Sequence, residues 1–266
     1  MKCCYIKRVL PLFGLFAHSC TKVIQVNLND ASPQIVIEGI INNRPGPYRV
    51  QIIRTVNFSD ANVYPAVSGA IVKITDSTSG ITDILTETSA GIYSTQILPQ
   101  GMPGHTYQLY VSVSGQTFTA TSAMPQPVLL DSVTFQDNNR FGTDNINAIA
   151  NFQDPPGTKN YYTFTEYVNN KQLNRIFASD DRLSNGKYIR QQFFNDSSYL
   201  RPGDNFVLEM NCVDQRVWNY FNTLEQVTNG NSFQSAAPSN PVTNIDNNAL
   251  GYFMASTVNS IDTTVK

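Results

Sequence analysis

The feature that most constrains the fold is a series of short runs in which apolar and polar residues alternate. Alternation with a period of two places every second side chain on one face of a strand, as a sheet with one buried face requires. These runs, separated by turn residues, are Gln34–Gly39, Tyr48–Thr55, Ala70–Thr75, Thr82–Glu87, Ile92–Ile97, Thr106–Val113 and Thr117–Ser122. Their spacing of roughly 8–12 residues predicts an immunoglobulin-like β-sandwich over residues 34–124.

A pair of prolines ends this series. Pro125 and Pro127 lie two residues apart, and both cannot sit inside a paired strand, so we expect a domain boundary there. Residues 128–258 predict a second β-rich domain. Its expected strands are Val128–Phe135, Asn147–Gln153, Asn160–Val168, Gln172–Ala178, Tyr188–Phe194, Asn205–Val213 and Gly251–Ser256. The Thr-rich run that follows the last strand is expected to be unstructured.

One helix is expected in the second domain, near residues 214–228. Asp214 is a suitable N-cap residue, and Asn229-Gly230 is a helix-ending signal. The apolar residues that recur at steps of three and four are Val217, Phe221, Leu224 and Val227. The fold class is therefore predicted to be mainly β, with a sandwich followed by a second β-rich domain that carries this helix.

The first residues have the three parts of a secretory signal peptide. Basic residues come first, an apolar run Val9–Phe16 follows, and the small residues Ala17 and Ser19 stand just before Cys20. The apolar run is about eight residues long, whereas a bilayer-spanning helix needs about 20. We therefore predict that residues 1–19 are a cleaved signal peptide.

Cys20 resembles the lipidated cysteine of bacterial lipoproteins. The prediction is a covalent lipid on Cys20, a tether over residues 20–33, and an anchor in the outer membrane, with no other cofactor. A cysteine that lies by chance near an ordinary cleavage site is the alternative. Cys3 and Cys4 leave with the signal peptide, so Cys212 alone remains as a thiol. Its place in an alternating strand predicts that it is buried and inert.

The charge and the polar residues point to binding rather than catalysis. The mature chain, without the three basic residues of the signal peptide, has 15 basic and 20 acidic residues and a net charge of −5. Electrostatic binding of nucleic acid is therefore not expected. His105 is the one histidine after residue 19, in a turn where we expect it to be exposed, and no nucleophile motif accompanies it. We predict that the chain is not an enzyme and holds no metal, although Asp137-Asn138-Asn139 and Asp144-Asn145 leave calcium open.

Aromatic residues are the candidate binding groups. The adjacent pairs Tyr161-Tyr162 and Phe193-Phe194 must each send one ring to either face of a strand. One ring of each pair can then be exposed for a ligand or a protein partner, because aromatic side chains anchor interfaces. The alternative is that most of these rings belong to the core.

A series of short motifs runs along the whole mature chain: Cys20-Thr21-Lys22, Ile35–Gly39, Gly46-Pro47-Tyr48, Val67–Ala70, Ala123-Met124-Pro125, Leu130-Asp131-Ser132, Pro202-Gly203-Asp204, Trp218–Phe221, Asn244-Ile245 and Ala249–Phe253. Together these motifs resemble a Bacteroidota lipoprotein family labelled domain of unknown function 4249. Stretches around Ser68–Ile74, Ala90–Tyr93 and Gly104–Leu109 also resemble small transthyretin-like sandwiches. The family resemblance implies an outer-membrane lipoprotein that is often encoded beside a TonB-dependent receptor.

Three functions follow as hypotheses. The first is an accessory lipoprotein that binds a partner, an outer-membrane β-barrel receptor of the TonB-dependent class, in nutrient uptake or envelope assembly. The second is a lipoprotein that binds a glycan or another ligand. The third is an unrecognised hydrolase. Because no acidic cluster follows Cys20, the sequence leaves open which face of the membrane the protein occupies.

Overall fold

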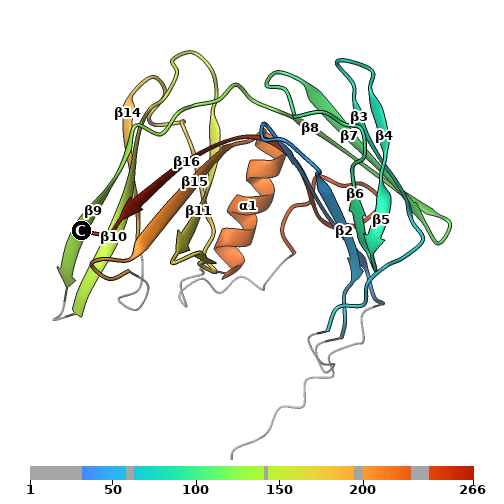
Figure 1. The fold of residues 1–266 in the computed structure, drawn as a ribbon, viewed down its shortest axis with the longest axis horizontal. Coiled ribbons are helices and arrows are strands. Elements are labelled where there is room, and N and C mark those ends of the chain that lie inside the picture. Colours follow the sequence, from blue (N-terminus) through green and yellow to red (C-terminus); the bar gives the residue numbers. More distant parts are fainter. Residues whose placement is uncertain (1–31, 58–62, 141–142, 195–199, 229–239) are drawn as a thin grey trace, which may run out of the picture. The chain divides into compact units, whose positions relative to one another are not determined.

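The part of the chain described by the computed structural model, residues 32–57, 63–140, 143–194, 200–228 and 240–266, is built almost entirely of strands (Figure 1). The strands are β1 (Ile35–Asn42), β2 (Arg49–Arg54), β3 (Ile71–Asp76), β4 (Thr82–Ile84), β5 (Thr86–Ser89), β6 (Ile92–Ser94), β7 (Thr106–Val113), β8 (Gln116–Ala123), β9 (Ser132–Arg140), β10 (Thr143–Gln153), β11 (Tyr161–Val168), β12 (Lys171–Gln172), β13 (Phe177–Asp180), β14 (Tyr188–Phe193), β15 (Asn205–Cys212) and β16 (Leu250–Thr264). The helix of this part is α1 (Gln215–Thr228). The predicted fold class, mainly β with one helix, is confirmed. Of residues 138–140, 143 and 144 the backbone alone is described.

The strands form three sheets. The largest has nine strands, in the order β12-β11-β15-β16-β1-β2-β6-β5 with β13 paired to β11. A four-stranded sheet, β4-β3-β7-β8, packs against the β1, β2 and β6 part of the large sheet and encloses the first hydrophobic core. A three-stranded sheet, β14-β10-β9, packs against the β11 and β15 part and encloses the second core. The chain therefore folds into β-sandwiches that share one sheet.

Strand β16 joins the two sandwiches. Its first half, from Leu250 to Ser256, pairs with β1 in parallel, and its second half, from Thr257 to Thr264, pairs with β15 antiparallel. The predictions of a last strand ending at Ser256 and of an unstructured Thr-rich end are wrong. The threonines of this end are β-branched and favour the extended backbone, and the strand holds Ile261 against the second core.

Two glycines permit the close parallel contact between β1 and β16. Gly251 has a φ of +92°, and a Cβ atom built there would lie 2.1 Å from the carbonyl oxygen of Ile37. A Cβ atom on Gly39 would lie 3.0 Å from the ring of Phe253, which is fully buried in the first core. Any larger residue at position 251 would push the two strands apart.

Two predicted strands are each divided in the structure. Thr82–Glu87 becomes β4 and β5, which belong to different sheets because Leu85 between them is buried and its N–H donates to the carbonyl oxygen of Val72 at 2.9 Å. Gln172–Ala178 becomes β12 and β13 because Leu173 turns into the second core. Alternation alone does not reveal such a change of direction.

The first core also contains residues from far along the chain. Ile245, Ala249, Phe253 and Ala255 pack in it with residues of the first sandwich. Residues 32–266 form one compact unit. The predicted division into a sandwich over 34–124 and a second domain over 128–258 stays a prediction.

Helix α1 begins at a capping aspartate. The Oδ1 atom of Asp214 accepts hydrogen bonds from the backbone N–H of Arg216 at 2.8 Å and of Val217 at 3.0 Å. Val217 is fully buried against Met254 of β16, on the face of the large sheet opposite the cores. The helix therefore covers part of the outer face of the shared sheet (Figure 1).

Candidate binding trough

The outer face of the large sheet forms the floor of a candidate binding site. On β1, alternation sends Ile37 and Ile41 into the first core. Glu38 and Ile40 consequently lie on the opposite face. The same alternation along β2, β16, β15 and β11 makes this face continuous over five neighbouring strands.

Two adjoining cavities hollow this face. The cavity beside α1 has a volume of about 290 Å³, and the cavity over β1 and β2 has a volume of about 350 Å³. Ile40, Asn42 and Tyr252 line both cavities, so the two join into one trough. The residues that line this trough include Glu38, Ile40, Asn42, Arg44, Arg49, Gln51, Thr163, Thr165, Tyr167, Arg175, Glu209, Asn211, Phe221, Tyr252, Met254 and Val258.

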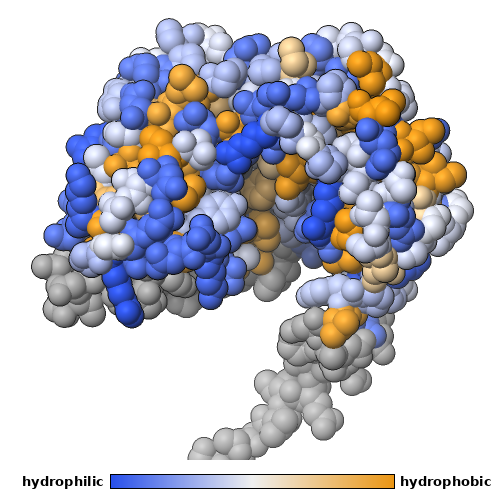
Figure 2. Space-filling view, in the orientation of Figure 1, coloured by the Kyte–Doolittle hydropathy of each residue, from blue (hydrophilic) through white to orange (hydrophobic). Residues whose placement is uncertain are grey.

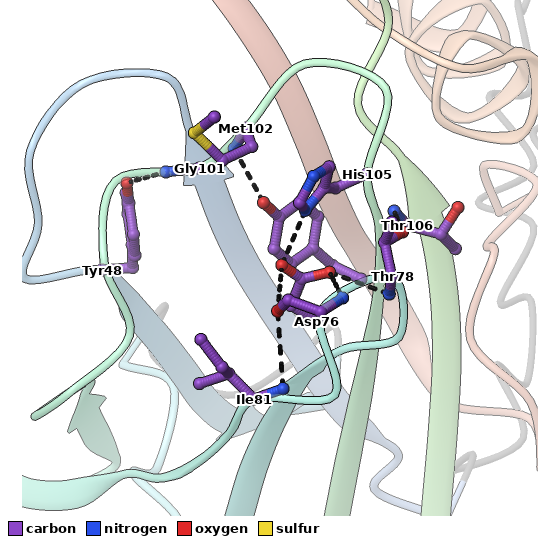
Figure 3. Close-up of polar contacts among 10 residues, drawn as sticks. Tyr48, Asp76, Thr78, Ile81, Gly101, Met102, His105 and Thr106 are labelled. Carbon is purple, nitrogen blue, oxygen red and sulfur yellow. Dashed lines mark hydrogen bonds and ion pairs between the residues drawn. The ribbon is translucent and has the colours of Figure 1, made fainter.

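A tyrosine fixes the loop that forms one wall. The hydroxyl of Tyr48 lies 2.8 Å from the carbonyl oxygen of Asn42 and 2.6 Å from that of Arg44. It also accepts a hydrogen bond from the backbone N–H of Gly101 at 2.8 Å (Figure 3). Because this one hydroxyl binds the start of the β1–β2 loop and Gly101 of a neighbouring loop, the backbone that carries Arg44 is fixed beside the floor.

An ion pair crosses the trough from this loop to β15. Arg44 Nη1 donates to Glu209 Oε1 at 2.6 Å, and Nη2 donates to Ser260 Oγ at 3.0 Å. The Tyr167 hydroxyl donates to the other Glu209 oxygen at 3.4 Å. Burial and then the nearby Glu209 carboxylate raise the pKa of Tyr167, while Arg44 opposes this. With 46% of the Arg44 side chain exposed, the pair positions polar groups more than it stabilises the fold.

Polar groups of three kinds meet at the β1–β2 end of the trough. Glu38 lies opposite Gln51 in the strand register, and Arg49 Nη2 donates to Gln51 Oε1 at 2.7 Å. Loss of hydration raises the pKa of Glu38, and the charge of Arg49 opposes this. Burial first and the Glu38 charge second raise the pKa of Tyr220 to about 12, and they also raise the pKa of Tyr252. A carboxylate, a guanidinium and an amide therefore share this end.

The wall beside the helix is aromatic. The ring of Tyr252 lies 4.9 Å from the rings of Tyr220 and Phe221, both on α1. These contacts fix Tyr252 at the junction of the two cavities.

The structure separates the four aromatic residues singled out by the sequence. Tyr162 and Phe193 are fully buried in the second core. Tyr161 is partly buried beside Trp218 at 5.4 Å, and Phe194 is 61% exposed. In each pair one ring is in the second core and the other is outside it, and the four do not form one site. Their functional role stays a prediction.

The predicted lipidation residue, Cys20, lies outside the described residues. Cys212 is buried with a free thiol, and burial raises its pKa. Within the part of the chain that the structure describes, no helix has the length and apolar character needed to span a bilayer.

The prediction that His105 is a freely exposed turn residue is wrong. Its Nδ1 lies 2.7 Å from Oδ2 of Asp76 at the end of β3, and the two side chains point toward one another (Figure 3). Asp76 is 5% exposed and also accepts hydrogen bonds from Ser79 and Thr78. Burial acts to raise the pKa of Asp76, but the hydrogen bonds from His105, Ser79 and Thr78 together lower it. This histidine connects two loops of the first sandwich.

The residues considered for calcium lie in paired strands. Asp137-Asn138-Asn139 belongs to β9 and Asp144-Asn145 to β10, and Asp144 pairs with Asn139 in the ladder. Within the described residues, no group of three or more His, Cys, Asp or Glu side chains could hold a metal ion.

A second surface is apolar. On the outer face of the four-stranded sheet, Ile84 and Tyr110 lie on either side of Lys73 in the strand register, and Ile71 lies two residues before Lys73 on β3. Ile84 is 62% exposed, and Lys73 lies over the Tyr110 ring at 5.5 Å. Hydrophobic residues gather over β3, β4 and β7 in Figure 2. We refer to Ile71, Lys73, Ile84 and Tyr110 as the outer apolar face.

Comparison with known proteins places the chain in a family. Residues 21–262 match the family described as Domain of unknown function (DUF4249). The chain belongs to this family. The β1–β16 junction unites two of the stretches that carried the resemblance, Ile35–Gly39 and Ala249–Phe253, within the span that the family covers.

Other comparisons add a distant likeness. No curated protein matches the chain. Among solved structures, the chain is similar to a two fibronectin type-III domain segment from chicken tenascin, with 11% identity over 69% of this chain and 92% of that chain and a TM-score of 0.22.

Sequence reasoning missed the polar residues of the trough. Arg44 lies between two of the predicted strands, and Arg49 and Gln51 lie on the polar face of the second of them. The available signal was the polar face of the second run, Tyr48–Thr55, which carries arginine and glutamine at alternate positions. The polar face of this run lines the trough only because β16 pairs with β1 and extends the sheet beside it.

Proposed function

We propose that this chain is a Bacteroidota lipoprotein, held at the outer membrane by a lipid on Cys20, that works by binding rather than by catalysis. Its partner in this proposal is an outer-membrane β-barrel receptor of the TonB-dependent class, in nutrient uptake or envelope assembly. The signal-like residues 1–19, the lipobox-like Cys20 and the family resemblance support the anchor and the partner.

The observation that carries the binding role is the trough on the shared sheet. Its floor strands are each paired to neighbours, so the polar groups on them stand in fixed positions before any ligand arrives. A preformed cavity with a few converging polar groups is the usual form of a ligand site. Pre-organisation of this kind lowers the entropic cost of binding.

The outer apolar face is the surface that we assign to the receptor. Exposed apolar side chains grouped on one face are typical of protein interaction sites. Ile84 and Tyr110 flank a lysine there, which gives an apolar contact with one charge for orientation. The trough and the outer apolar face belong to different sheets of the fold, so both can be used at once.

Membrane fractionation tests the anchor. The comparison is made with Ile84→Asp also present, so that the proposed receptor contact is lost. The chain with Cys20 should then fractionate with membranes, and the chain with Cys20→Ala should be soluble. If Cys20→Ala still fractionates with membranes there, the lipid anchor is wrong.

Affinity purification after gentle detergent extraction tests the partner. A β-barrel receptor should be recovered in stoichiometric amount with the wild-type chain and with Leu129→Asp, a control at a residue that is 63% exposed elsewhere. Ile84→Asp should lose it, because a buried unpaired charge opposes association. Recovery of the chain alone contradicts the receptor, and equal recovery with Ile84→Asp contradicts the assignment of the outer apolar face.

A further inference from the structure

The charges of the trough are largely compensated within it. Arg44 is paired with Glu209 at 2.6 Å. Arg49 donates to Gln51, which lies opposite Glu38 in the strand register, so its charge stands beside that carboxylate and opposes the rise of the Glu38 pKa. Arg175 is the remaining cation of the lining, and it lies over an aromatic ring at 5.3 Å. With three arginines and two glutamates the lining keeps one uncompensated charge, so it favours an uncharged ligand, because a charged ligand would meet no strong field of opposite sign.

The hydrogen-bonding groups of the trough are of the kind that recognises hydroxyls. The side-chain oxygens of Asn211 and Gln51 accept hydrogen bonds from Ser256 and Arg49. The amide N–H₂ group of each side chain points away from that contact. Glu38 adds a carboxylate that accepts hydrogen bonds. Because a hydroxyl both donates and accepts, a ligand with many hydroxyls can satisfy this mixture of donors and acceptors.

The backbone hydrogen-bonding groups of the floor strands already have partners. β1 pairs with both β16 and β2, while β16 pairs with β1 along its first half and with β15 along its second half. Away from these partners the backbone of β16 is bonded by side chains: Asn244 donates to the carbonyl oxygen of Phe253 and accepts from its N–H, and Asn43 accepts from the N–H of Val258. A peptide therefore cannot add to these strands as a further strand, which is the usual way that a sheet binds an extended peptide. Side chains must provide the recognition.

The length of the trough and its aromatic lining fit an extended ligand. It runs across five strands from β2 to β11, and four spacings of about 4.8 Å give a length of about 19 Å. Tyr167, Phe221 and Tyr252 line it and offer apolar surface beside the polar groups. The ligand is thus elongated, with apolar faces and many polar edges.

We propose that the trough binds a neutral oligosaccharide, with its hydroxyls on Glu38, Gln51 and Asn211 and its ring faces beside Tyr252 and Phe221. This inference rests on the proposed function only in taking the trough to be a binding site. It adds the chemical class of the ligand.

Calorimetric titration of the full chain carrying Cys20→Ala tests the proposal. The probes are neutral glucan, mannan and xylan oligosaccharides from one to six units, acidic galacturonate oligomers, and extended peptides of neutral composition. A neutral oligosaccharide should bind, with an affinity that rises with length until about 19 Å of trough is filled. The affinity should change little with salt.

Matched variants at Glu38 separate a neutral ligand from a cationic one. Glu38→Gln keeps the shape and the hydrogen-bonding ability, so the affinity for the sugar should fall by no more than about threefold, while Glu38→Leu should lose about tenfold or more. Gln108→Ala, on an exposed position of β7 outside the trough, should bind as the parent does. Equal loss in Glu38→Gln and Glu38→Leu contradicts a neutral ligand.

The other outcomes separate the two proposals. Binding of a peptide or of galacturonate in place of neutral sugars, with loss in Glu38→Leu, overturns the oligosaccharide but keeps the trough as a binding site. Sugar binding that Glu38→Leu, Gln51→Leu and Asn211→Leu all leave unchanged overturns both. Absence of binding by any of the probes, with the far-ultraviolet spectrum intact, overturns the oligosaccharide and leaves receptor recovery as the separate test of the proposed function.

Discussion

Replacement of Gly251 by alanine should destabilise the fold far more than an ordinary glycine replacement. The new Cβ would lie 2.1 Å from the Ile37 carbonyl oxygen and 2.8 Å from its carbon, both backbone atoms that cannot move without separating β1 from β16. The φ of +92° adds roughly 1–2 kcal/mol of backbone strain. Loss of two ladder hydrogen bonds, at about 1 kcal/mol each, and looser packing of buried Phe253 bring the total to about 4 kcal/mol.

Urea unfolding of the chain carrying Cys20→Ala measures this cost. Gly80→Ala is the control, because Gly80 has a φ of +79° but no atom within 4 Å of the new Cβ. The control should lose about 1 kcal/mol, so the two variants should differ by about 3 kcal/mol. That difference is large against a total stability of about 5–15 kcal/mol. If both variants lose the same free energy, β1 and β16 are not in the close parallel contact described above.

Three further predictions concern stability. Asp76→Asn should cost about 1–2 kcal/mol at pH 7. The fold lowers the pKa of Asp76, so the contribution of this carboxylate to stability is present above the unfolded pKa of about 3.9 and is lost as pH falls through the folded pKa. The unfolding free energies of parent and variant, measured in urea, should therefore converge below about pH 4. A difference in unfolding free energy that stays constant with pH would contradict the hydrogen bonds described. Asp214→Ala should lower the unfolding free energy by about 2 kcal/mol, because one carboxylate oxygen caps α1 and the other accepts hydrogen bonds from Ser122 and Ala123. A loss under about 0.5 kcal/mol in thermal unfolding followed by circular dichroism would refute this. Arg44→Met should change the unfolding free energy by less than about 1 kcal/mol, because the pair is partly exposed, and a larger loss would show that the pair supports the fold.

Local patterns predicted the strands because each strand buries one face. The run Asn205–Val213 illustrates this, since Phe206, Leu208, Met210 and Cys212 all point into the second core as their alternation predicts. The helix is likewise readable from Asp214, whose side chain caps it, and from the apolar spacing that follows. In these cases the residues that decide the structure are neighbours in the chain.

The trough could not be predicted in this way. It depends on β16 lying beside β1, two segments more than 200 residues apart, and on Gly251, whose need for positive φ follows from the position of Ile37. In the sequence, the polar residues of the trough are indistinguishable from an ordinary solvent-exposed strand face, because the residues that complete the trough lie on other strands. Alternation separates adjacent aromatic residues, as Tyr161 and Tyr162 show, but it carries no information on which ring meets a cavity.

Hydrogen–deuterium exchange on the chain carrying Cys20→Ala tests most directly whether recognition occurs on the shared sheet. The measurement compares peptides with and without the tightest-binding neutral oligosaccharide at saturation. Peptides that cover β1, β2 and the junction of β15 with β16 should become protected, while peptides from β7 and β8 should not change. Protection confined to the four-stranded sheet, or equal exchange with and without bound sugar, would contradict the trough as the binding site.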